Sequence, residues 1–248
     1  IVLQDVSYCY DGEREVLHHV NMIFPEHGLT SIVGESGCGK STVASLIMGL
    51  QRGYMGSVRV GGREVSALRE DSRMKQMTIM SIGSYIFKGT IRENLEMGRK
   101  GASEDEMWQA LRQVNLAGFV QENGGLEMKL LERGSNLSGG QCQRLALARA
   151  LLHDSAIYIF DEATSNIDAE SENDIMAVLR TLAQHKNVIL ISHRLANVVP
   201  SDRIYVMDAG QVIEQGTHEE LLQTGGQYAR LWKTQAELER YDGKEVTA

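Results

Sequence analysis

The chain has 248 residues, of which 42% are hydrophobic and 23% are charged, a balance typical of an ordinary globular protein. Its formal net charge of −8 argues against a nucleic-acid partner, because proteins that bind nucleic acids need a basic face. No run of about 18 apolar residues occurs, so no segment of this sequence is expected to span a membrane.

The N-terminal third of the sequence predicts strands, one helix and a hairpin. Residues 1–10, 16–24 and 29–34 are rich in β-forming side chains. The last of these leads into a glycine-rich turn, after which apolar residues recur at helical spacing over 41–50. Residues 57–65 carry Gly-Gly in the middle and are typical of a hairpin.

The rest of the sequence alternates between helical and strand patterns. The predicted helices cover residues 104–120, 139–153, 169–185 and two segments within 218–241 that are separated by Gly-Gly. The predicted strands cover residues 156–160 and 187–192, and a second hairpin covers 203–216. Strands that alternate with helices predict an α/β fold built on a mostly parallel sheet.

A glycine-rich loop between a predicted strand and a predicted helix reads GESGCGKST and matches G-x-x-x-x-G-K-S/T. Its backbone N–H groups and the helix N-terminus can hold phosphate oxygens, so the pattern predicts ATP binding. Lys40 is expected to reach the terminal phosphates and the Ser41 hydroxyl to ligate Mg²⁺. The predicted nucleotide-binding residues of this loop are Gly34, Glu35, Ser36, Gly37, Cys38, Gly39, Lys40, Ser41 and Thr42.

Two acids end the apolar strand at residues 156–160. Asp161 is expected to join the Mg²⁺ shell, and Glu162 could polarise an attacking water as the general base. The alternative is an acidic turn that caps the next segment.

The stretch NLSGGQ, residues 136–141, opens the next predicted helix. Ser138, Gly139 and Gly140 would form a second anion-binding helix N-terminus. Simple helix capping by Ser138 is the alternative.

Together these motifs resemble the nucleotide-binding domain of ABC transporters, over essentially the whole chain. The resemblance implies a single domain with a P-loop NTPase core and mostly parallel sheet, an antiparallel N-terminal β-subdomain and an inserted α-helical subdomain. The core and β-subdomain would cover residues 1–81 and 156–248, and about 82–155 would hold the Q-loop, the helical subdomain and the signature helix.

The same resemblance assigns further roles. Lys40, Glu162 and the switch histidine His193 would be catalytic. An aromatic residue would stack on adenine; Tyr10 fits best and Tyr8 is the second candidate, while two tyrosines that merely alternate on a strand are the alternative. The signature residues would cap the γ-phosphate of ATP held by a second nucleotide-binding domain; they are Ser138, Gly139, Gly140 and Gln141.

The chain also resembles the exporter branch of the family, in IFKGTIRENL at residues 86–95 and GTHEELL at 216–222. In exporters this domain is usually fused behind a membrane domain, and a chain that begins at Ile1 agrees with that arrangement. Residues 84–90 would then face the membrane domain. The expected location is the cytoplasmic face of a bacterial inner membrane, and the three cysteines, at no metal-like spacing, fit a reducing compartment.

Three positions depart from the family pattern. Lys129 stands where exporters often carry glutamate, and Asn166 stands in the D-loop, residues 165–168, where alanine is common. Ile82 falls where the Q-loop glutamine should contact Mg²⁺ and the attacking water. Gln76 precedes a predicted strand and is too distant to replace it, Ser81 or Ser84 could supply a hydroxyl, and a shift of the alignment by one or two residues is a further alternative.

The sequence therefore predicts an ATPase motor domain of an exporter that closes head-to-tail with a second copy or a homologue. The alternative is an ATP-binding regulatory half of a heterodimer, with hydrolysis impaired by Ile82. A soluble ABC ATPase of DNA repair or translation is disfavoured, since the sequence contains neither tandem cassettes nor a long coiled-coil insertion.

Cys38 is also expected to be a reactive thiolate, because Lys40 and a helix N-terminus lie beside it. The alternative is that cysteine is simply a small residue tolerated at this position.

Overall fold

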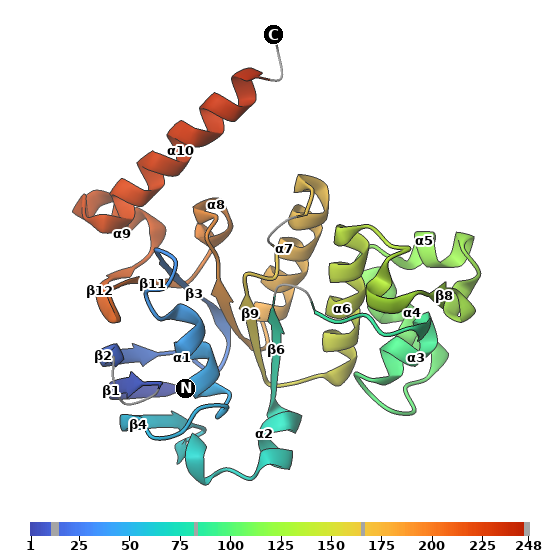
Figure 1. Cartoon of the computed structure of the whole chain (residues 1–248), viewed down its shortest axis with the longest axis horizontal. Helices are drawn as coiled ribbons and strands as arrows, with labels where there is room; N and C mark the ends of the chain where they lie inside the picture. The colour runs from blue at the N-terminus through green and yellow to red at the C-terminus, as the bar shows by residue number, and fades with distance from the viewer. Residues whose placement is uncertain (11–14, 82–83, 165–166, 246–248) are drawn as a thin grey trace. The chain divides into compact units, whose positions relative to one another are not determined.

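The computed structural model describes residues 1–10, 15–81, 84–164 and 167–245. The chain divides into two compact units (Figure 1). The first unit contains Ile1–Arg69 and Ile189–Ala248, and the second contains Glu70–Val188. The subdomain boundaries predicted near residues 81 and 156 differ from this division and stay a prediction.

An antiparallel sheet forms the N-terminal part of the first unit, as predicted. Its strand order is β2 (Glu15–Ile23), β1 (Val2–Cys9), β4 (Met55–Val60) and β5 (Arg63–Glu64). Strands β4 and β5 form the predicted hairpin, with Arg59 opposite Glu64 and the Gly-Gly pair in the turn. The face of the sheet that is buried carries Leu3, Val6, Leu17 and Val20, all 2% exposed or less.

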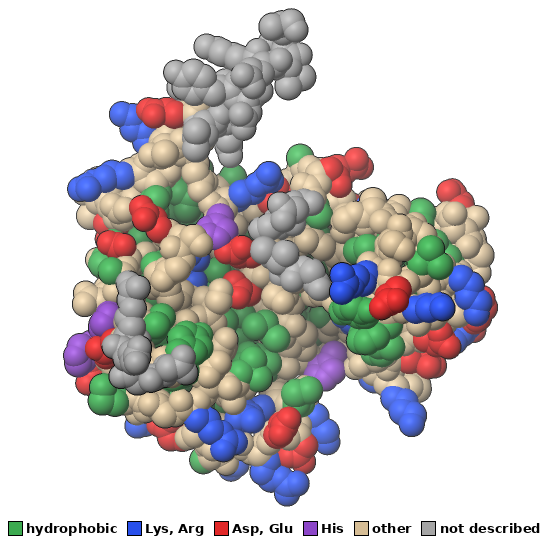
Figure 2. Space-filling model, in the orientation of Figure 1, with side chains coloured by type: hydrophobic (Ala, Val, Ile, Leu, Met, Phe, Trp, Pro, Cys, Tyr) green, Lys and Arg blue, Asp and Glu red, His purple; other side chains and the backbone are tan. Residues whose placement is uncertain are grey.

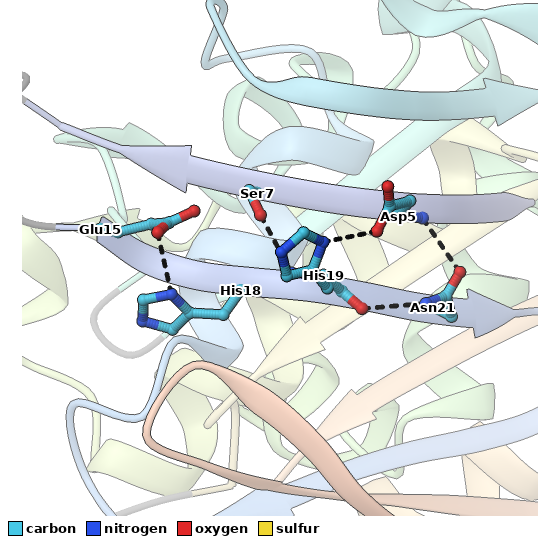
Figure 3. Close-up of polar contacts among 6 residues, drawn as sticks. All are labelled: Asp5, Ser7, Glu15, His18, His19 and Asn21. Carbon is cyan, nitrogen blue, oxygen red and sulfur yellow. Dashed lines mark hydrogen bonds and ion pairs between the residues drawn. The ribbon is translucent and has the colours of Figure 1, made fainter.

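Strands β1 and β2 contain a bulged segment held together by polar side chains (Figure 3). Asp5 and His19 have positive φ angles of 52° and 51°, a conformation in which short polar side chains often bond to nearby backbone. The Asp5 N–H donates to Asn21 Oδ1 at 2.9 Å, and the His19 N–H donates to Ser7 Oγ at 3.0 Å. His19 Nδ1 lies 2.7 Å from Asp5 Oδ1, so the two strained residues are also joined to each other.

The remaining strands of the first unit continue the core. Strand β3 (Gly28–Gly34) runs parallel to β11 (Arg203–Asp208), with Ile32 opposite Tyr205, and β11 pairs antiparallel with β12 (Gln211–Gly216) as the predicted second hairpin. Central residues of β3 and β11 are fully buried, as is typical of parallel strands covered on both faces. The helices of this unit are α1 (Lys40–Ile47), α8 (Leu195–Val198), α9 (His218–Thr224) and α10 (Gln227–Glu245).

The second unit contains a parallel strand pair and most of the helices. Strand β6 (Met77–Ser81) runs parallel to β9 (Ile157–Asp161), which places Ser81 opposite Asp161 at the carboxyl ends of the two strands. The helices are α2 (Glu70–Gln76), α3 (Ile91–Glu96), α4 (Glu104–Gln113), α5 (Ala117–Glu122), α6 (Gly139–His153) and α7 (Ala169–Ala183). A two-residue ladder joins β7 (Gly89–Thr90) to β8 (Lys129–Leu130), and β10 (Asn187–Ile191) spans the division between the units.

The surface carries both signs of charge. On the face drawn in Figure 2, Lys and Arg side chains are interspersed with Asp and Glu. Within the described ranges, no helix combines the length and the apolar character needed to cross a bilayer. Cys9, Cys38 and Cys142 are all free thiols.

Candidate nucleotide-binding site

The glycine-rich loop connects β3 to α1 in the first unit. Gly39 is the N-cap of α1 and has a φ of 106°, a backbone conformation that residues with a side chain rarely adopt. A Cβ at this position would lie 2.7 Å from Leu17 Cδ2 and 3.2 Å from the Val16 carbonyl oxygen. The second glycine of the motif is therefore required both by its backbone conformation and by the close approach of β2.

Lys40 is turned back onto the loop that carries it. Its Nζ donates to the carbonyl oxygens of Gly34 and Glu35, both at 2.8 Å, and the residue is only 4% exposed. Ser41, the next residue, is exposed in the first turn of α1. The loop thus combines a buried cation, an exposed hydroxyl and the N–H groups that every helix leaves unpaired at its start, which are the groups that bind phosphate and its metal.

A cavity of about 310 Å³ lies beside the loop and is lined by Glu15, Val16, His18, Gly37, Ala209 and Gly210. His18 Nδ1 lies 3.0 Å from Glu15 Oε2 at its edge (Figure 3). The Gly210 N–H donates to the Cys38 carbonyl oxygen at 3.2 Å, and the His18 N–H donates to the Gly210 carbonyl oxygen at 2.9 Å. These bonds fix the loop to β2 and to the turn between β11 and β12.

Cys38 does not have the predicted thiolate character. The residue is 6% exposed, and burial raises the pKa of its thiol, outweighing the opposite effect of the nearby Lys40 ammonium. Lys40 Nζ also donates to the Cys38 sulfur at 3.8 Å, but this bond and the charge lower the thiol pKa less than burial raises it. The prediction of a reactive thiolate is therefore wrong. It rested on the positive charge beside the thiol and did not include the cost of burying a thiolate.

Of the two candidate tyrosines, Tyr10 presents the exposed ring. Tyr10 is 48% exposed, whereas Tyr8 is 6% exposed and donates its hydroxyl to Gln51 Oε1 at 2.9 Å. The two rings pack edge to face, with centroids 5.0 Å apart. The Tyr10 hydroxyl also lies 3.1 Å from Thr42 Oγ1, so its ring is tied to the first turn of α1, a contact that the sequence pattern did not suggest.

In the second unit, buried strand β9 delivers Asp161 to the sheet edge and Glu162 to the turn beyond it. Both residues are partly exposed. Glu162 has a φ of 55°, which is strained for a residue with a long side chain. Strain of this kind is found where a side chain must be aimed in one direction.

The signature sequence opens α6 with a capping box. The Gln141 N–H donates to Ser138 Oγ at 3.2 Å, and the Ser138 N–H donates to Gln141 Oε1 at 2.9 Å. Helix capping by Ser138, one of the two interpretations of this stretch, is therefore present. Ser138 and Gly139 nevertheless remain exposed. Asn136, which the sequence patterns left without a role, bonds the Leu131 N–H and the Lys129 carbonyl oxygen and so fixes the loop before the helix.

The exporter-like stretch GTIREN is an N-terminal capping arrangement. Thr90 and Glu93 form a capping box at the start of α3. Asn94, only 1% exposed, accepts from the Phe87 N–H and donates to the carbonyl oxygens of Phe87 and Thr90, all at 2.9 Å. This network leaves Tyr85 and Phe87 exposed at 40% and 43%, with their rings 4.8 Å apart between centroids.

His193 follows β10 in the first unit and is exposed. Ser192 Oγ accepts from the Arg194 N–H at 3.0 Å and so braces the turn around it. Ser84 donates its hydroxyl to the Ser81 carbonyl oxygen at 3.1 Å. Ile82 and the D-loop residue Asn166 lie outside the described residues.

The structure thus groups Tyr10, Lys40 and Thr42 within the first unit, and it places Asp161, Glu162 and the signature residues within the second. Among the described side chains, no group of three or more His, Cys, Asp or Glu residues could hold a metal ion by itself.

Comparison with known proteins agrees with these motifs. Residues 17–165 match the family model for ABC transporters. An uncharacterized ABC transporter ATP-binding protein of Haemophilus influenzae is 46% identical over 240 residues, which cover 97% of this chain and 43% of that protein. An ATM1-type heavy metal exporter of Novosphingobium aromaticivorans is 37% identical, over 95% of this chain and 39% of its own length.

A solved structure of a bacterial Atm1-family ABC exporter with ATP bound has a TM-score of 0.90 and 36% identity. The match covers 95% of this chain and 42% of that one, so the chain spans less than half the length of these relatives. The agreement confirms the predicted combination of a mostly parallel sheet, an antiparallel β-subdomain and helices. The chain belongs to the ABC transporter family, as an ATP-binding ATPase domain, and it is similar in sequence and structure to the corresponding domain of exporters.

Proposed function

We propose that this chain is the ATP-driven motor of an exporter, and that it closes head-to-tail with a second nucleotide-binding domain around two ATP molecules. The observation that carries the proposal is the state of the phosphate loop. Its lysine is buried, and the contacts described above join it to two loop carbonyl oxygens and to the Cys38 sulfur. An arriving triphosphate can exchange those neutral acceptors for charged ones, which form stronger bonds.

The residues that would hold the nucleotide come from the first unit. Tyr10 would stack on adenine with its exposed ring, and the loop from Gly34 to Thr42 would surround the phosphates. The bond between Tyr10 and Thr42 supports this arrangement, because it links the expected adenine platform to the phosphate-binding helix.

Ser41 and Asp161 would supply oxygen ligands to Mg²⁺. Hydroxyl and carboxylate oxygens suit this ion, which commonly keeps few protein ligands and binds the nucleotide phosphates as well. When bound, Mg²⁺ neutralises charge on the phosphates; Glu162 would accept a proton from the attacking water, and His193 would contact the γ-phosphate.

The signature residues would act on the nucleotide of the partner domain. Ser138 and Gly139 are exposed at the start of a long helix, where a hydroxyl and N–H groups favour an anion. A chain that provides both a phosphate loop and an exposed signature helix can fill both roles in a head-to-tail pair.

The exposed pair Tyr85 and Phe87 would contact a membrane domain, which we propose is fused before this domain as in exporters. The lysine at 129 would alter the charge of that contact. The motor would then work at the cytoplasmic face of a membrane, a bacterial inner membrane by analogy with the relatives.

Residue 82 favours a second candidate function, a regulatory half-site that binds ATP and hydrolyses it slowly. Ile82 has no polar side-chain atom that could take the Q-loop role.

Substitution Glu162→Gln tests the motor proposal. The variant should bind MgATP and remain closed, because the binding groups are intact while the base is lost. Size-exclusion chromatography should show an ATP-dependent dimer that ADP does not support, and Lys40→Ala in the same background should remove it. A Glu162→Gln protein that stays monomeric at tens of micromolar with saturating MgATP would contradict closure by this domain alone.

A further inference from the structure

We infer that Gln235, on the C-terminal helix α10, is a positioning residue for the loop that carries His193. This inference rests on the catalytic role proposed for His193 and adds to it the side chain that holds its backbone. The contact lies within the first unit. The sequence motifs gave no role to any residue of α10.

The contact uses both ends of one amide group. Gln235 Oε1 accepts from the Leu195 N–H at 2.9 Å, and Gln235 Nε2 donates to the carbonyl oxygen of His193. The two bonds bracket Arg194. One side chain therefore fixes the backbone on both sides of the turn that follows His193.

The loop needs such a partner. Leu195 is the first residue of α8, and the N-cap of that helix, Arg194, makes no side-chain capping bond. Leu195 is 2% exposed, so its N–H would lose its partner in a place that water reaches poorly, which is costly. Gln235 replaces the missing local cap from a distant part of the chain.

Helix α10 is itself firmly anchored at its start. The Glu214 carboxylate accepts from the N–H groups of Gln227 and Tyr228. Tyr228 is fully buried, and its hydroxyl lies 2.8 Å from His218 Nδ1. The His218 ring also packs against Trp232, with centroids 4.6 Å apart.

The spacing of residues along α10 places Gln235 on the same helix face as the anchored residues. Tyr228, Trp232 and Gln235 lie at positions i, i+4 and i+7 and share one face of the helix. The rise of an α-helix places Gln235 about 10 Å beyond Tyr228. A helix held at its first turn thus presents the amide at a defined position.

The two bonds have separable chemical requirements. A glutamate at 235 could still accept from the Leu195 N–H, but it could not donate to the His193 carbonyl oxygen. A leucine of similar size could do neither. Gln235→Glu and Gln235→Leu therefore distinguish capping of α8 from control of His193.

The first measurement is hydrogen exchange of the Leu195 amide by mass spectrometry with overlapping fragments. Gln235→Leu should speed exchange about tenfold, while Gln235→Glu should leave it slow. Thr234→Ala is the matched control, since Thr234 is exposed and bonds only within the helix, to the Arg230 carbonyl oxygen, among its described contacts. Exchange in Gln235→Leu equal to that in Thr234→Ala would overturn the contact.

The second measurement is ATP hydrolysis by the complete protein. Gln235→Leu and Gln235→Glu should both lower kcat about tenfold and leave the KM for ATP within about twofold, because the phosphate loop is untouched. Thr234→Ala should match the wild type. A wild-type kcat in Gln235→Glu would overturn the inference, and so would a rise in KM with kcat unchanged.

His193→Ala separates this inference from the function on which it rests. If that variant loses hydrolysis and Gln235→Leu does not, only the role of Gln235 is refuted. If His193→Ala hydrolyses ATP at the wild-type rate, the proposed role of His193 falls, and the positioning role of Gln235 falls with it.

Discussion

Glu162 combines a catalytic assignment with a strained backbone, and the strain should be measurable as lost stability. Its φ of 55° costs a residue with a side chain roughly 1–2 kcal/mol, and glycine avoids this cost. Glycine also loses about 0.5–1 kcal/mol through the greater freedom of its unfolded chain. Glu162→Gly should therefore be more stable than Glu162→Ala by about 0.5–1 kcal/mol, although both lack the carboxylate.

Thermal unfolding without nucleotide provides the assay, because bound ligand would shift both midpoints. For a chain of this size the difference corresponds to a Tm about 1–4 °C higher in Glu162→Gly than in Glu162→Ala. Using alanine as the reference removes the effect of losing side-chain contacts, which both variants share. A Glu162→Ala protein as stable as Glu162→Gly would show that the backbone at this position is not strained, and the argument would fail.

Three further outcomes are expected. Ile82→Gln should raise kcat and lower the Mg²⁺ concentration that gives half the maximal rate; if neither changes in an active form of the protein, position 82 is not the Q-loop site. Cys38 should react with maleimide more slowly than the partly exposed Cys9 at neutral pH, since burial of Cys38 raises the pKa of its thiol, and faster labelling of Cys38 would contradict its burial. Burial raises the pKa of Tyr228 to about 12, so the stability that this neutral phenol contributes should be complete below about pH 10 and lost as the pH rises through 12. Alkaline unfolding monitored by circular dichroism should show a smaller loss over that range in Tyr228→Phe, and an identical loss in both proteins would refute the assignment.

The sequence predicted the features that depend on local patterns. Gly-Gly between two β-rich runs predicted the hairpin of β4 and β5, and the phosphate loop was readable because its residues lie in one continuous stretch. The capping box of Thr90 and Glu93 also has a local signature, a threonine followed three positions later by glutamate. The same signature could have predicted the start of α3.

Other features depend on residues that are distant in the chain. The burial of Cys38 arises from the surrounding fold, whereas the sequence shows only its neighbour Lys40. Gln235 lies 40 positions after Leu195, so nothing near either residue indicates their bond. Glu162 has its positive φ directly after a strand. Neither glycine nor asparagine, the residues that usually adopt this conformation, stands at that position to predict it.

The close packing of α6 against α7 limits how the signature sequence can change. A Cβ at Gly140 would lie 2.8 Å from the Ser171 Cβ, and the Ser171 N–H is the group that Asp168 caps at 2.8 Å. One turn further along, Arg144 and Asp174 join the same two helices. A larger residue at 140 would therefore require Ser171 or one of the two helices to shift, so the residues tolerated at this signature position depend on a serine that lies outside the signature.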